Sequence, residues 1–498
     1  MSIETVATWR SLVSNCRTLG WAAFVATGAI LWGYDSQIGG ILLASYQFRH
    51  DFGYVLDDEP VISAMWQAAF SSAAAFGGIS GSIMCGSIAD RLGRRAALAI
   101  GCLVSIIAVS IEYFATSSVA LVIGKLVNGC ALGAFLTTSS VYCAETSPVE
   151  LRGITTSAIH FCIAIGNLLA SVALKVFGNF PTRAAYRIPF AIQWLFPIIL
   201  LSGLPFCPES PWWLLRQGRF PQAMSSLQSL GISNPEVELN YIQEMIKNEA
   251  SQAHLNFLDC FRGVDLRRTE IATGVFVVQQ LLGPVFMIGY APYFFELAGL
   301  VSEASFSLTV ALSLSGIFGN VVSWFLVNTA GRRLTFFLGT CILTICLFVV
   351  GMMEVIPCDG MVPVHIQSLA CGVYDFIYFL TVGPMTYTIL SEVSSPILRS
   401  RTVGLGFVVQ NVFYLTLSIL IPFLINPDEA NMKGRVAFIF AAASVPSILW
   451  VYVRVPETKS RTFKELTQLF EEGVPARDFA TQGVNVPEFE ALIESSEE

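Results

Sequence analysis

Long apolar blocks alternate with short polar segments along most of the 498-residue chain, and this pattern restricts the possible folds more than any other feature. A helix needs roughly 20 consecutive apolar residues to cross a bilayer. Charged residues make up only 13% of the chain, about half of the roughly 25% typical of soluble domains. The pattern predicts an all-α membrane protein with twelve transmembrane helices. The expected spans are residues 19–43, 61–84, 96–115, 119–143, 155–177, 187–207, 270–297, 303–328, 334–355, 366–390, 403–425 and 435–453.

The positions of Lys and Arg predict the orientation of these spans. With the N-terminus inside, 21 of the 28 basic residues lie on the cytoplasmic side, six lie outside and Lys125 lies within a span. Because basic loops stay on the cytoplasmic side, we expect both termini in the cytoplasm. The first eighteen residues are polar, and the apolar run after them is too long for a signal peptide. We therefore interpret that run as the first span.

Cysteine and histidine positions indicate neither a metal site nor a disulfide framework. The twelve cysteines are scattered without a CxxC pair, and the four histidines do not cluster. The run FGGISGSIMCG at 76–86 precedes no GK[ST], so it is typical of close helix packing rather than of a phosphate loop. No nucleophile and base stand in a catalytic pattern. We expect no metal, no cofactor, no nucleic-acid partner and no enzymatic activity.

Three motifs occur twice in the same order, which implies two related halves. The pairs are ADRLGRR (89–95) with NTAGRR (328–333), AETSPVELRG (144–153) with SEVSSPILRSR (391–401), and PESPWWLLRQGR (208–219) with PETKSRTFKEL (456–466). The offsets are 238 residues from Asp90 to Asn328, 247 from Glu145 to Glu392 and 248 from Glu209 to Glu457. Transporters built from repeats place the substrate near the midplane between the halves. The expected domains are a cytoplasmic tail at 1–18, six-helix halves at 19–207 and 269–454, a cytoplasmic helical linker at 208–268 and a cytoplasmic tail at 455–498.

Charged residues of the repeated motifs are candidates for a gate on the cytoplasmic face. The Gly-Arg-Arg turns place cations at the membrane surface, within reach of the acidic residues in the other repeated loops. Ion pairs among them would hold that side closed; the alternative is that the arginines only set the topology. The gate candidates are Asp90, Arg91, Arg94, Arg95, Glu145, Arg152, Glu209, Arg332, Arg333, Glu392, Arg399 and Glu457.

The set and order of the motifs resemble the sugar porter branch of the major facilitator superfamily, from about residue 28 to 480. They are GYD, DRLGRR, ETSPVELRG, PESPWWL, QQLLG, AGRR, SEVSSPILR and PETKSRTF. YRIPFAIQWLFP (186–197), FMIGYAPYFFELAG (286–299) and VGPMTYTILSE (382–392) are most similar to fungal maltose and general α-glucoside permeases. The resemblance implies the major facilitator fold, alternating access, and symport of a sugar with protons across the fungal plasma membrane. We expect a functional monomer, because one chain contains both halves of the site.

One acidic residue lies about halfway along the first expected span. Asp35 would cost roughly 2.5–3.5 kcal/mol there on insertion scales. In proton-coupled members of the resembled family an Asp at this place takes up the proton and pairs with an Arg in a GRxxxG pattern. The matching stretch is GKLVNG at 124–129, so the resemblance implies Lys125 as the partner. Asp35 and Lys125 lie roughly 12 and 9 Å from the outer ends of their spans. A purely structural ion pair is the alternative.

Polar residues of other spans are candidates for contact with the substrate. The resemblance implies that Gln279 and Gln280 bind sugar, and amides suit sugar hydroxyls because they both donate and accept hydrogen bonds. His160 stands where the family has a sugar-binding Gln, and Tyr387 where hexose porters have a Trp. Hydrogen bonding and packing between helices are the alternative. The substrate-binding candidates are His160, Asn167, Gln279, Gln280, Tyr387 and Asn411.

Departures from the family pattern leave two other transport hypotheses open. Trp32 stands where the α-glucoside symporters have a Glu, and Val285 stands where hexose porters have an Asn. The other departures are Lys125, His160 and Tyr387, described above. A transporter of another organic solute, such as a secondary metabolite, would change these positions first, and a facilitator would carry sugar without protons. A sugar sensor is disfavoured, because the tail after about residue 455 is short.

Overall fold

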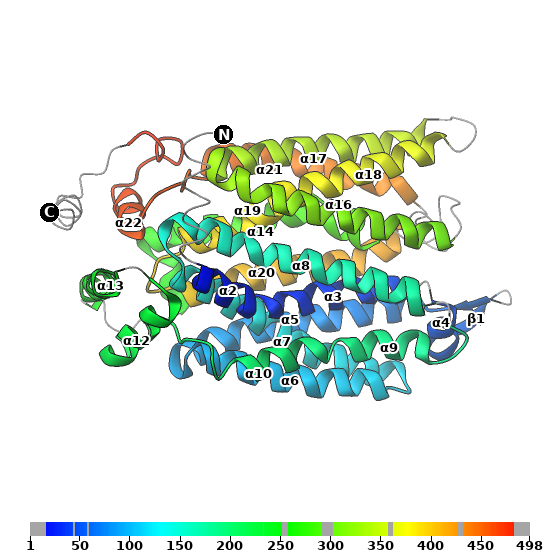
Figure 1. Ribbon diagram of the computed structural model, residues 1–498. Coiled ribbons are helices and arrows are strands. Elements are labelled where there is room, and N and C mark those ends of the chain that lie inside the picture. The colour runs from blue at the N-terminus through cyan, green and yellow to red at the C-terminus, as the bar shows by residue number, and fades with distance from the viewer. Residues whose placement is uncertain are drawn as a thin grey trace.

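The computed structural model describes residues 16–42, 45–56, 59–178, 180–232, 234–250, 257–290, 302–356, 362–425, 430 and 432–482. Long helices run side by side along one axis (Figure 1), and a short β-hairpin lies at one end of the bundle. We call this the hairpin end. The opposite end, beside α12, α13 and α22, is called the linker end.

The first half of the chain forms a group of long helices and the hairpin. Its elements are α2 (Cys16–Val25), α3 (Thr27–Leu42), α4 (Tyr46–Phe52), β1 (Tyr54–Leu56), β2 (Glu59–Val61), α5 (Ala64–Leu92), α6 (Arg94–Phe114), α7 (Ser118–Thr146), α8 (Val149–Phe177), α9 (Ala184–Ile192) and α10 (Leu195–Gly203). The strands pair antiparallel, with Tyr54 opposite Val61. Within the described residues this hairpin is the one addition to the predicted all-α class.

Shorter helices follow at the linker end. They are α11 (Pro211–Arg216), α12 (Phe220–Leu230), α13 (Pro235–Ala250) and the 3-10 turn η1 (Phe257–Phe261), and α22 (Phe463–Glu471) joins them from the C-terminal side. A capping box fixes the start of α22, because Thr462 and Glu465 bond each other's backbone N–H groups. An ion pair of 3.2 Å between Lys464 and Glu244 connects α22 to α13.

The second half of the chain forms the other group of long helices. Its elements are α14 (Gly263–Leu281), the π-helix η2 (Val285–Gly289), α16 (Ser302–Thr329), α17 (Arg332–Val355), α18 (Val362–Leu380), α19 (Val382–Val393), α20 (Arg399–Ile425), η3 (Lys433–Arg435) and α21 (Val436–Arg454).

Ten segments of the described chain are long and apolar enough to cross a membrane as helices. The two other expected spans, 19–43 and 270–297, are broken helices. The first breaks at Ala26, between α2 and α3. The second breaks after α14, where Gly283 has a φ of +79° and Pro284 follows, since a proline disfavours helix at the residue before it. Residues 291–297 of that span lie outside the described residues. The predicted membrane class is confirmed, and the twelve-helix count is consistent with these segments.

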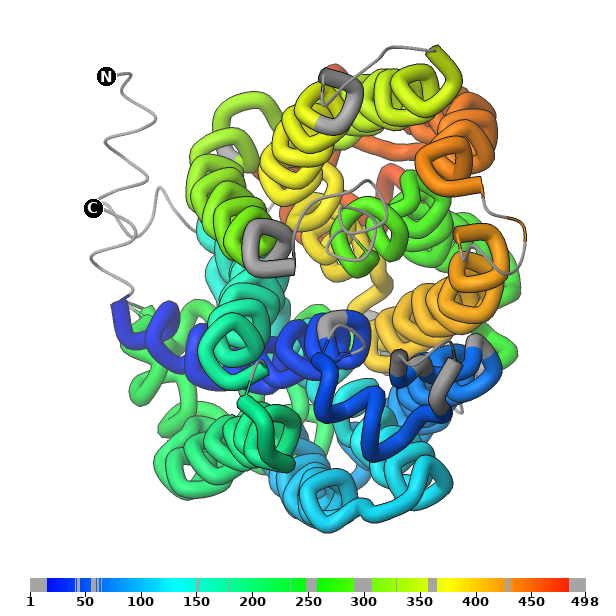
Figure 2. The backbone as a smooth tube through the Cα atoms, turned by 90° about the vertical axis from the view of Figure 1, so that its right-hand side faces the viewer, coloured from blue at the N-terminus to red at the C-terminus, as the bar shows by residue number. Residues whose placement is uncertain are grey.

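The hydrophobic side chains form two main clusters, one in each part of the sequence. One cluster contains residues between Val25 and Cys207. The other contains residues between Ile271 and Phe479, together with Ala164 of α8. Seen along the bundle axis, the two groups lie beside each other (Figure 2). They meet where α5 packs on α20 and where α8 packs on α16 and α19. The exact domain boundaries stay a prediction.

Glycines let several helices of the first half touch through their backbones. A Cβ added at Gly33 would lie 2.1 Å from the Ile163 carbonyl oxygen, which joins α3 closely to α8. Within the 76–86 run, a Cβ at Gly77 or Gly81 would lie 2.1 or 2.0 Å from carbonyl oxygens of α7. The run therefore packs α5 against α7, as small residues do between membrane helices. This close contact holds α3 and α7, which carry the charged pair described next, against α8 and α5.

Candidate functional site

A central cavity lies between the two halves. Pockets that bind small molecules are usually preformed spaces of this kind with a few polar groups on their walls. The space between protein atoms there, open solvent included, is about 870 Å³. From the first half, its polar and aromatic lining residues are Trp32, Ser36 and Gln37 of α3, Ser71 of α5, and His160 and Asn167 of α8. From the second half they are Gln279 and Gln280 of α14, Tyr290 directly after η2, Tyr378 and Phe379 of α18, Tyr387 of α19, and Gln410, Tyr414 and Ser418 of α20.

Gln279 and Gln280 line this cavity near the C-terminal end of α14. Both are almost completely buried, with exposed fractions of 1% and 4%. The side-chain oxygen of each has no hydrogen-bond partner among the described residues. A buried amide oxygen without a partner is costly, so a ligand hydroxyl in the cavity would stabilise both side chains. The structure thus places both predicted glutamines at the cavity, and the side-chain oxygen of each can still accept a hydrogen bond.

His160 faces the same cavity from α8 and contacts the other half of the chain. Its Nδ1 lies 2.9 Å from the side-chain nitrogen of Asn320 in α16. Its ring packs against the rings of Tyr378, Phe379 and Tyr387. Asn320 is absent from the sequence-based candidates, because it is one amide in an apolar helix without a motif. The His160–Asn320 contact therefore joins the halves beside the cavity.

Of the other predicted substrate residues, the structure places two at the cavity and one beside it. Asn167 lines the cavity, and its side-chain oxygen has no partner among the described residues. Tyr387 also lines it. Asn411 does not: it packs against Gly78 of α5 and donates to the Phe407 carbonyl. Its neighbour Gln410 faces the cavity instead. The sequence pattern thus identified the correct helix turn but not the side chain that points inward.

Asp35 and Lys125 form a buried ion pair between α3 and α7. The Lys125 Nζ lies 2.5 Å from the Asp35 Oδ1, and the side chains are 5% and 3% exposed. Asn128, one turn along α7, donates a hydrogen bond of 3.3 Å to the same carboxylate oxygen. The contact agrees with the similar depths of the two residues in their spans. Glu112 of α6 also lies 3.4 Å from the ammonium; it was not predicted, because one acid near the end of an apolar block looks like an interfacial residue.

A smaller cavity lined by this pair lies beside the central one. Asp35 and Lys125 both line it, together with Asn411, Gly78 and other small residues. Four residues, Trp32, Ser36, Ser71 and Tyr414, line both cavities. The ion pair therefore lies one layer of side chains away from the space between the halves.

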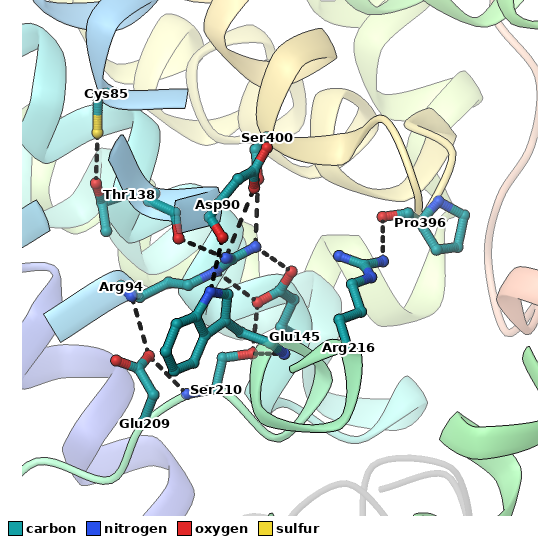
Figure 3. A network of polar contacts seen from close by, with 12 residues as sticks. Cys85, Asp90, Arg94, Thr138, Glu145, Glu209, Ser210, Arg216, Pro396 and Ser400 are labelled. Atoms are coloured by element: carbon teal, nitrogen blue, oxygen red, sulfur yellow. Dashed lines mark hydrogen bonds and ion pairs between the residues drawn. The ribbon is translucent and has the colours of Figure 1, made fainter. Parts of the chain in front are cut away.

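A compact charged network closes the linker end of the first half (Figure 3). Arg94 donates from Nε and Nη2 to the two oxygens of Glu145, at 3.1 and 2.9 Å. Ser210 donates to the same carboxylate at 2.5 Å. The backbone N–H groups of Arg94 and Arg95 donate to Glu209, both at 3.1 Å. Such bidentate pairs are strong and fix geometry, so this network holds α6, α7 and the segment before α11 together.

The second half repeats this network residue for residue. Arg332 donates to both oxygens of Glu392, at 3.2 and 2.9 Å. Thr458 donates to Glu392, and the backbone N–H groups of Arg332 and Arg333 donate to Glu457. Gly93 and Gly331, which precede the two arginines, have φ values of +96° and +84°, a region that favours glycine. The predicted repeat is thus visible as a repeated set of contacts.

The gating role stays a prediction, and the contacts show which of the charged residues pair within a half and which reach across. The described Arg94–Glu145 and Arg332–Glu392 ion pairs join helices within a half rather than across the halves. Contacts across the halves centre on Ser400, which donates to Asp90 at 2.9 Å and accepts from Arg94 at 3.3 Å. Arg216 of the linker donates to the Pro396 carbonyl of the second half at 2.8 Å.

The remaining gate candidates have different surroundings. Arg399 is buried, and its guanidinium lies 4.0 Å from the Phe463 ring centroid and 5.7 Å from that of Trp212. Arg95 and Arg333 bond backbone carbonyls with their side chains, and Arg91 is exposed. The backbone of Arg152 lies in α8, but its side chain is outside the described part of the chain. Arg399 therefore connects three segments at the linker end.

Comparisons with known proteins agree with this architecture. The general α-glucoside permease of Saccharomyces cerevisiae is 29% identical over 488 residues, covering 93% of this chain and 77% of the relative. Maltose permease MAL31 of the same species is 30% identical, covering 94% of this chain and 78% of that one. The solved structure of the proton:xylose symporter XylE with 6-bromo-6-deoxy-D-glucose superposes with a TM-score of 0.79 at 21% identity, over 92% of this chain and 100% of that chain. The profile described as "Sugar (and other) transporter" matches residues 21–470, so the chain belongs to this family of major facilitator transporters.

Proposed function

We propose that this multi-pass membrane protein takes up a sugar, an α-glucoside such as maltose or a hexose, together with protons. The observation that carries the proposal is the buried Asp35–Lys125 pair in a pocket that shares four lining residues with the amide-lined central cavity. Its relatives are permeases rather than enzymes. The names of the α-glucoside and maltose permeases and of the proton:xylose symporter support the same chemistry.

The central cavity supplies groups that suit a sugar. Gln279, Gln280 and Asn167 each hold an amide oxygen to which none of the described residues donates, and these oxygens can accept from hydroxyl groups. Gln410 adds a fourth amide, also with a free oxygen among the described residues. Aromatic rings of Trp32 and Tyr387 provide apolar faces beside them. Amides that orient hydroxyls and rings that cover C–H surface are the mixture expected in a pocket for a small polar ligand.

Proton coupling would act through the charge of Asp35. While ionised, this carboxylate holds Lys125 and joins α3 to α7. A proton that binds to it removes the charge and weakens that contact. The protonated and ionised proteins then favour different conformations, which is sufficient to link proton binding to movement of the halves. Uptake is therefore expected to be faster at acid pH.

The contacts at the linker end suggest how the central cavity would open in turn to the two sides of the membrane. We place the linker end in the cytoplasm, with both termini there, and the protein in the plasma membrane as a functional monomer. In this arrangement the Asp90–Ser400 and Arg216–Pro396 contacts close the cytoplasmic side. Opening that side would break these contacts between the halves while Arg94–Glu145 and Arg332–Glu392 keep each half intact. We retain 19–207 and 269–454 as the moving halves.

A second candidate is transport of another organic solute, which the aromatic setting of His160 favours. This ring packs among three aromatic rings and bonds Asn320, so less of it is free to bind a sugar hydroxyl. Uptake of labelled maltose, glucose and xylose by yeast that lacks its own sugar carriers separates the two candidates. Saturable uptake of one of them supports sugar transport. No uptake of any, with the protein shown at the cell surface, favours the other solute.

Replacement of Gln280 by Ala is expected to raise the KM for the sugar by up to about tenfold. A hydrogen bond contributes about 0.5–1.5 kcal/mol, and each 1.4 kcal/mol is tenfold in affinity. Initial uptake rates over a range of sugar concentrations measure this effect. The matched control is Gln228→Ala, at an exposed position of α12, which is expected to leave KM unchanged. An unchanged KM in Gln280→Ala would remove this residue from the sugar site.

A further inference from the structure

The charged pair has a third member that the proposed function does not use. Glu112 lies near the C-terminal end of α6, and its Oε2 is 3.4 Å from the Lys125 Nζ. Its side chain is fully buried. Apart from the Lys125 ammonium, no hydrogen-bond donor reaches either carboxylate oxygen from the described residues. The ammonium of Lys125 is thus the group that compensates the charge of Glu112.

The helices around Glu112 bring few other charges to it. α7 contributes Lys125, and α3 contributes Asp35, and these two act electrostatically on Glu112. α9 carries Arg187, whose guanidinium lies over the Tyr113 ring, 5.7 Å from its centroid. The sequence LFPIILLSG of α10 has no titratable residue. The charged residues of α5, Asp90 and Arg91, lie at the other end of that helix. Within the described residues, Asp35, Lys125 and Glu112 therefore form one electrostatic unit.

Lysine suits such a unit better than arginine would. Its ammonium is a compact charge with three donors on a rotatable stem, whereas the planar guanidinium favours one carboxylate in a two-bond contact. The Lys125 Nζ has Asp35 at 2.5 Å, Glu112 at 3.4 Å and the Phe190 ring centroid at 5.4 Å. A small rotation of the stem would move the ammonium from one carboxylate to the other.

The two carboxylates differ in their access to the cavities. Asp35 and Lys125 line the smaller cavity, whereas Glu112 is not among its lining residues. A proton that enters through this cavity therefore reaches Asp35 first. Glu112, enclosed between α6 and α7, is placed as a fixed negative charge. A Cβ added at Gly124 would lie 2.6 Å from its Cγ, so the absence of a side chain at Gly124 leaves room for the Glu112 side chain.

We propose that Glu112 is the counter-ion that keeps Lys125 paired whenever Asp35 carries the transported proton. In the proton-free state the two carboxylates share one ammonium, and the unit has a net charge of −1. A proton from hydronium then forms an O–H bond on Asp35, the donor is left as a water molecule, and the unit becomes neutral with Lys125 held by Glu112. Release of the proton reverses the step. The inference rests on the proposed proton coupling and explains why a lysine is tolerated at this position.

The pH dependence of transport tests the role of this charge. Without Glu112, the proton-loaded unit would carry a net positive charge in a buried site, so Asp35 would bind protons more weakly. Glu112→Gln is expected to move the half-maximal pH of uptake toward acid by about one unit, because a nearby charge changes proton affinity by amounts of this order. The matched control is Glu354→Gln, at a partly exposed glutamate of α17, which is expected to leave the profile in place. If Glu112→Gln only lowers the amount of protein and its half-maximal pH of uptake equals that of the wild type, the proposal is overturned.

A stability measurement tests the shared ammonium without any transport assay. Thermal unfolding of the purified full-length protein in detergent is compared for Asp35→Asn, Glu112→Gln and the double variant. Each single variant leaves Lys125 one carboxylate, whereas the double variant leaves a buried ammonium without an anionic partner. The expected result is a loss in the double variant clearly larger than the sum of the single losses, or failure of only the double variant to fold. Additive losses, or failure of Glu112→Gln alone to fold, would overturn the proposal.

These two measurements keep the inference separate from the proposed function. If the wild type takes up no sugar with protons, the proposed function fails, and the stability comparison still decides whether Glu112 and Asp35 share Lys125. If the wild type shows proton-coupled uptake and the Glu112→Gln profile does not move, the proposed function stands and the role of Glu112 is wrong.

Discussion

Replacement of Lys125 by Met is expected to remove most folded protein from the membrane and to abolish uptake. The variant leaves the carboxylates of Asp35 and Glu112 buried without the ammonium that compensates them. Loss of one member of a buried ion pair costs about 3–5 kcal/mol, which is a large part of the roughly 5–15 kcal/mol that stabilises a typical folded protein. Quantification of the protein at the cell surface and of initial uptake rates measures both effects.

Two companion variants separate loss of charge balance from loss of the side chain itself. The neutral triple variant Asp35→Asn/Glu112→Gln/Lys125→Met removes all three charges and is expected to regain folded protein without proton-coupled uptake. Lys175→Met, at an exposed position of α8, is expected to resemble the wild type. If Lys125→Met folds and transports normally, the ammonium does not balance the buried carboxylates.

Replacement of Arg94 or Arg332 by Ala is expected to destabilise the protein by similar amounts, about 3–5 kcal/mol each. Each guanidinium makes a two-bond contact with a buried glutamate, Glu145 or Glu392, and donates to a backbone carbonyl. Removal of either arginine leaves its glutamate buried without this partner. Thermal unfolding of the purified protein in detergent measures the loss, and uptake is expected to fall with it.

The repeat supplies an internal comparison for this prediction. Arg94 also donates 3.3 Å to Ser400 in the other half, so Arg94→Ala is expected to disturb closure of the linker end as well. Arg91→Ala is the matched control, because Arg91 follows Asp90 in the same motif but is exposed. Its stability is expected to stay within experimental error of the wild type. A loss in Arg91→Ala as large as in Arg94→Ala would show that the described network is not the cause.

The sequence contained enough information for the architecture and for the charged residues of the repeated loops. Apolar blocks of bilayer length have few alternatives to helices, and the 238-residue offset between the Gly-Arg-Arg turns reappears as the offset between Arg94 and Arg332. The partners of these arginines were less predictable. Their guanidinium groups pair with glutamates of the same half, and Arg94 also reaches across to Ser400, a residue that has no charge to mark it in the sequence.

Residues without a motif could not be predicted from one sequence. Glu112, Asn320 and Gln410 are single polar residues in apolar helices, and only the rotation of each helix decides whether such a side chain faces lipid, a neighbour or a cavity. The Asn411 and Gln410 pair illustrates this, because a step of one residue turns the side chain by about 100° around the helix axis. Once the structure is known, the proline at 284 explains the break at Gly283–Pro284. The apolar pattern of 270–297 alone predicted one continuous span.

The most direct test of proton coupling is the pH of weakly buffered medium around yeast that lacks its own sugar carriers and expresses this protein. The transported sugar is added to cells with the wild type or with Asp35→Asn, at equal amounts of surface protein. Proton symport predicts that the wild type alkalinises the medium as sugar enters, that its uptake is faster at about pH 5 than at about pH 7.5, and that Asp35→Asn loses both effects. Sugar uptake without alkalinisation in the wild type, at an equal rate in Asp35→Asn, would contradict proton coupling and make Asp35 a structural residue of a facilitator.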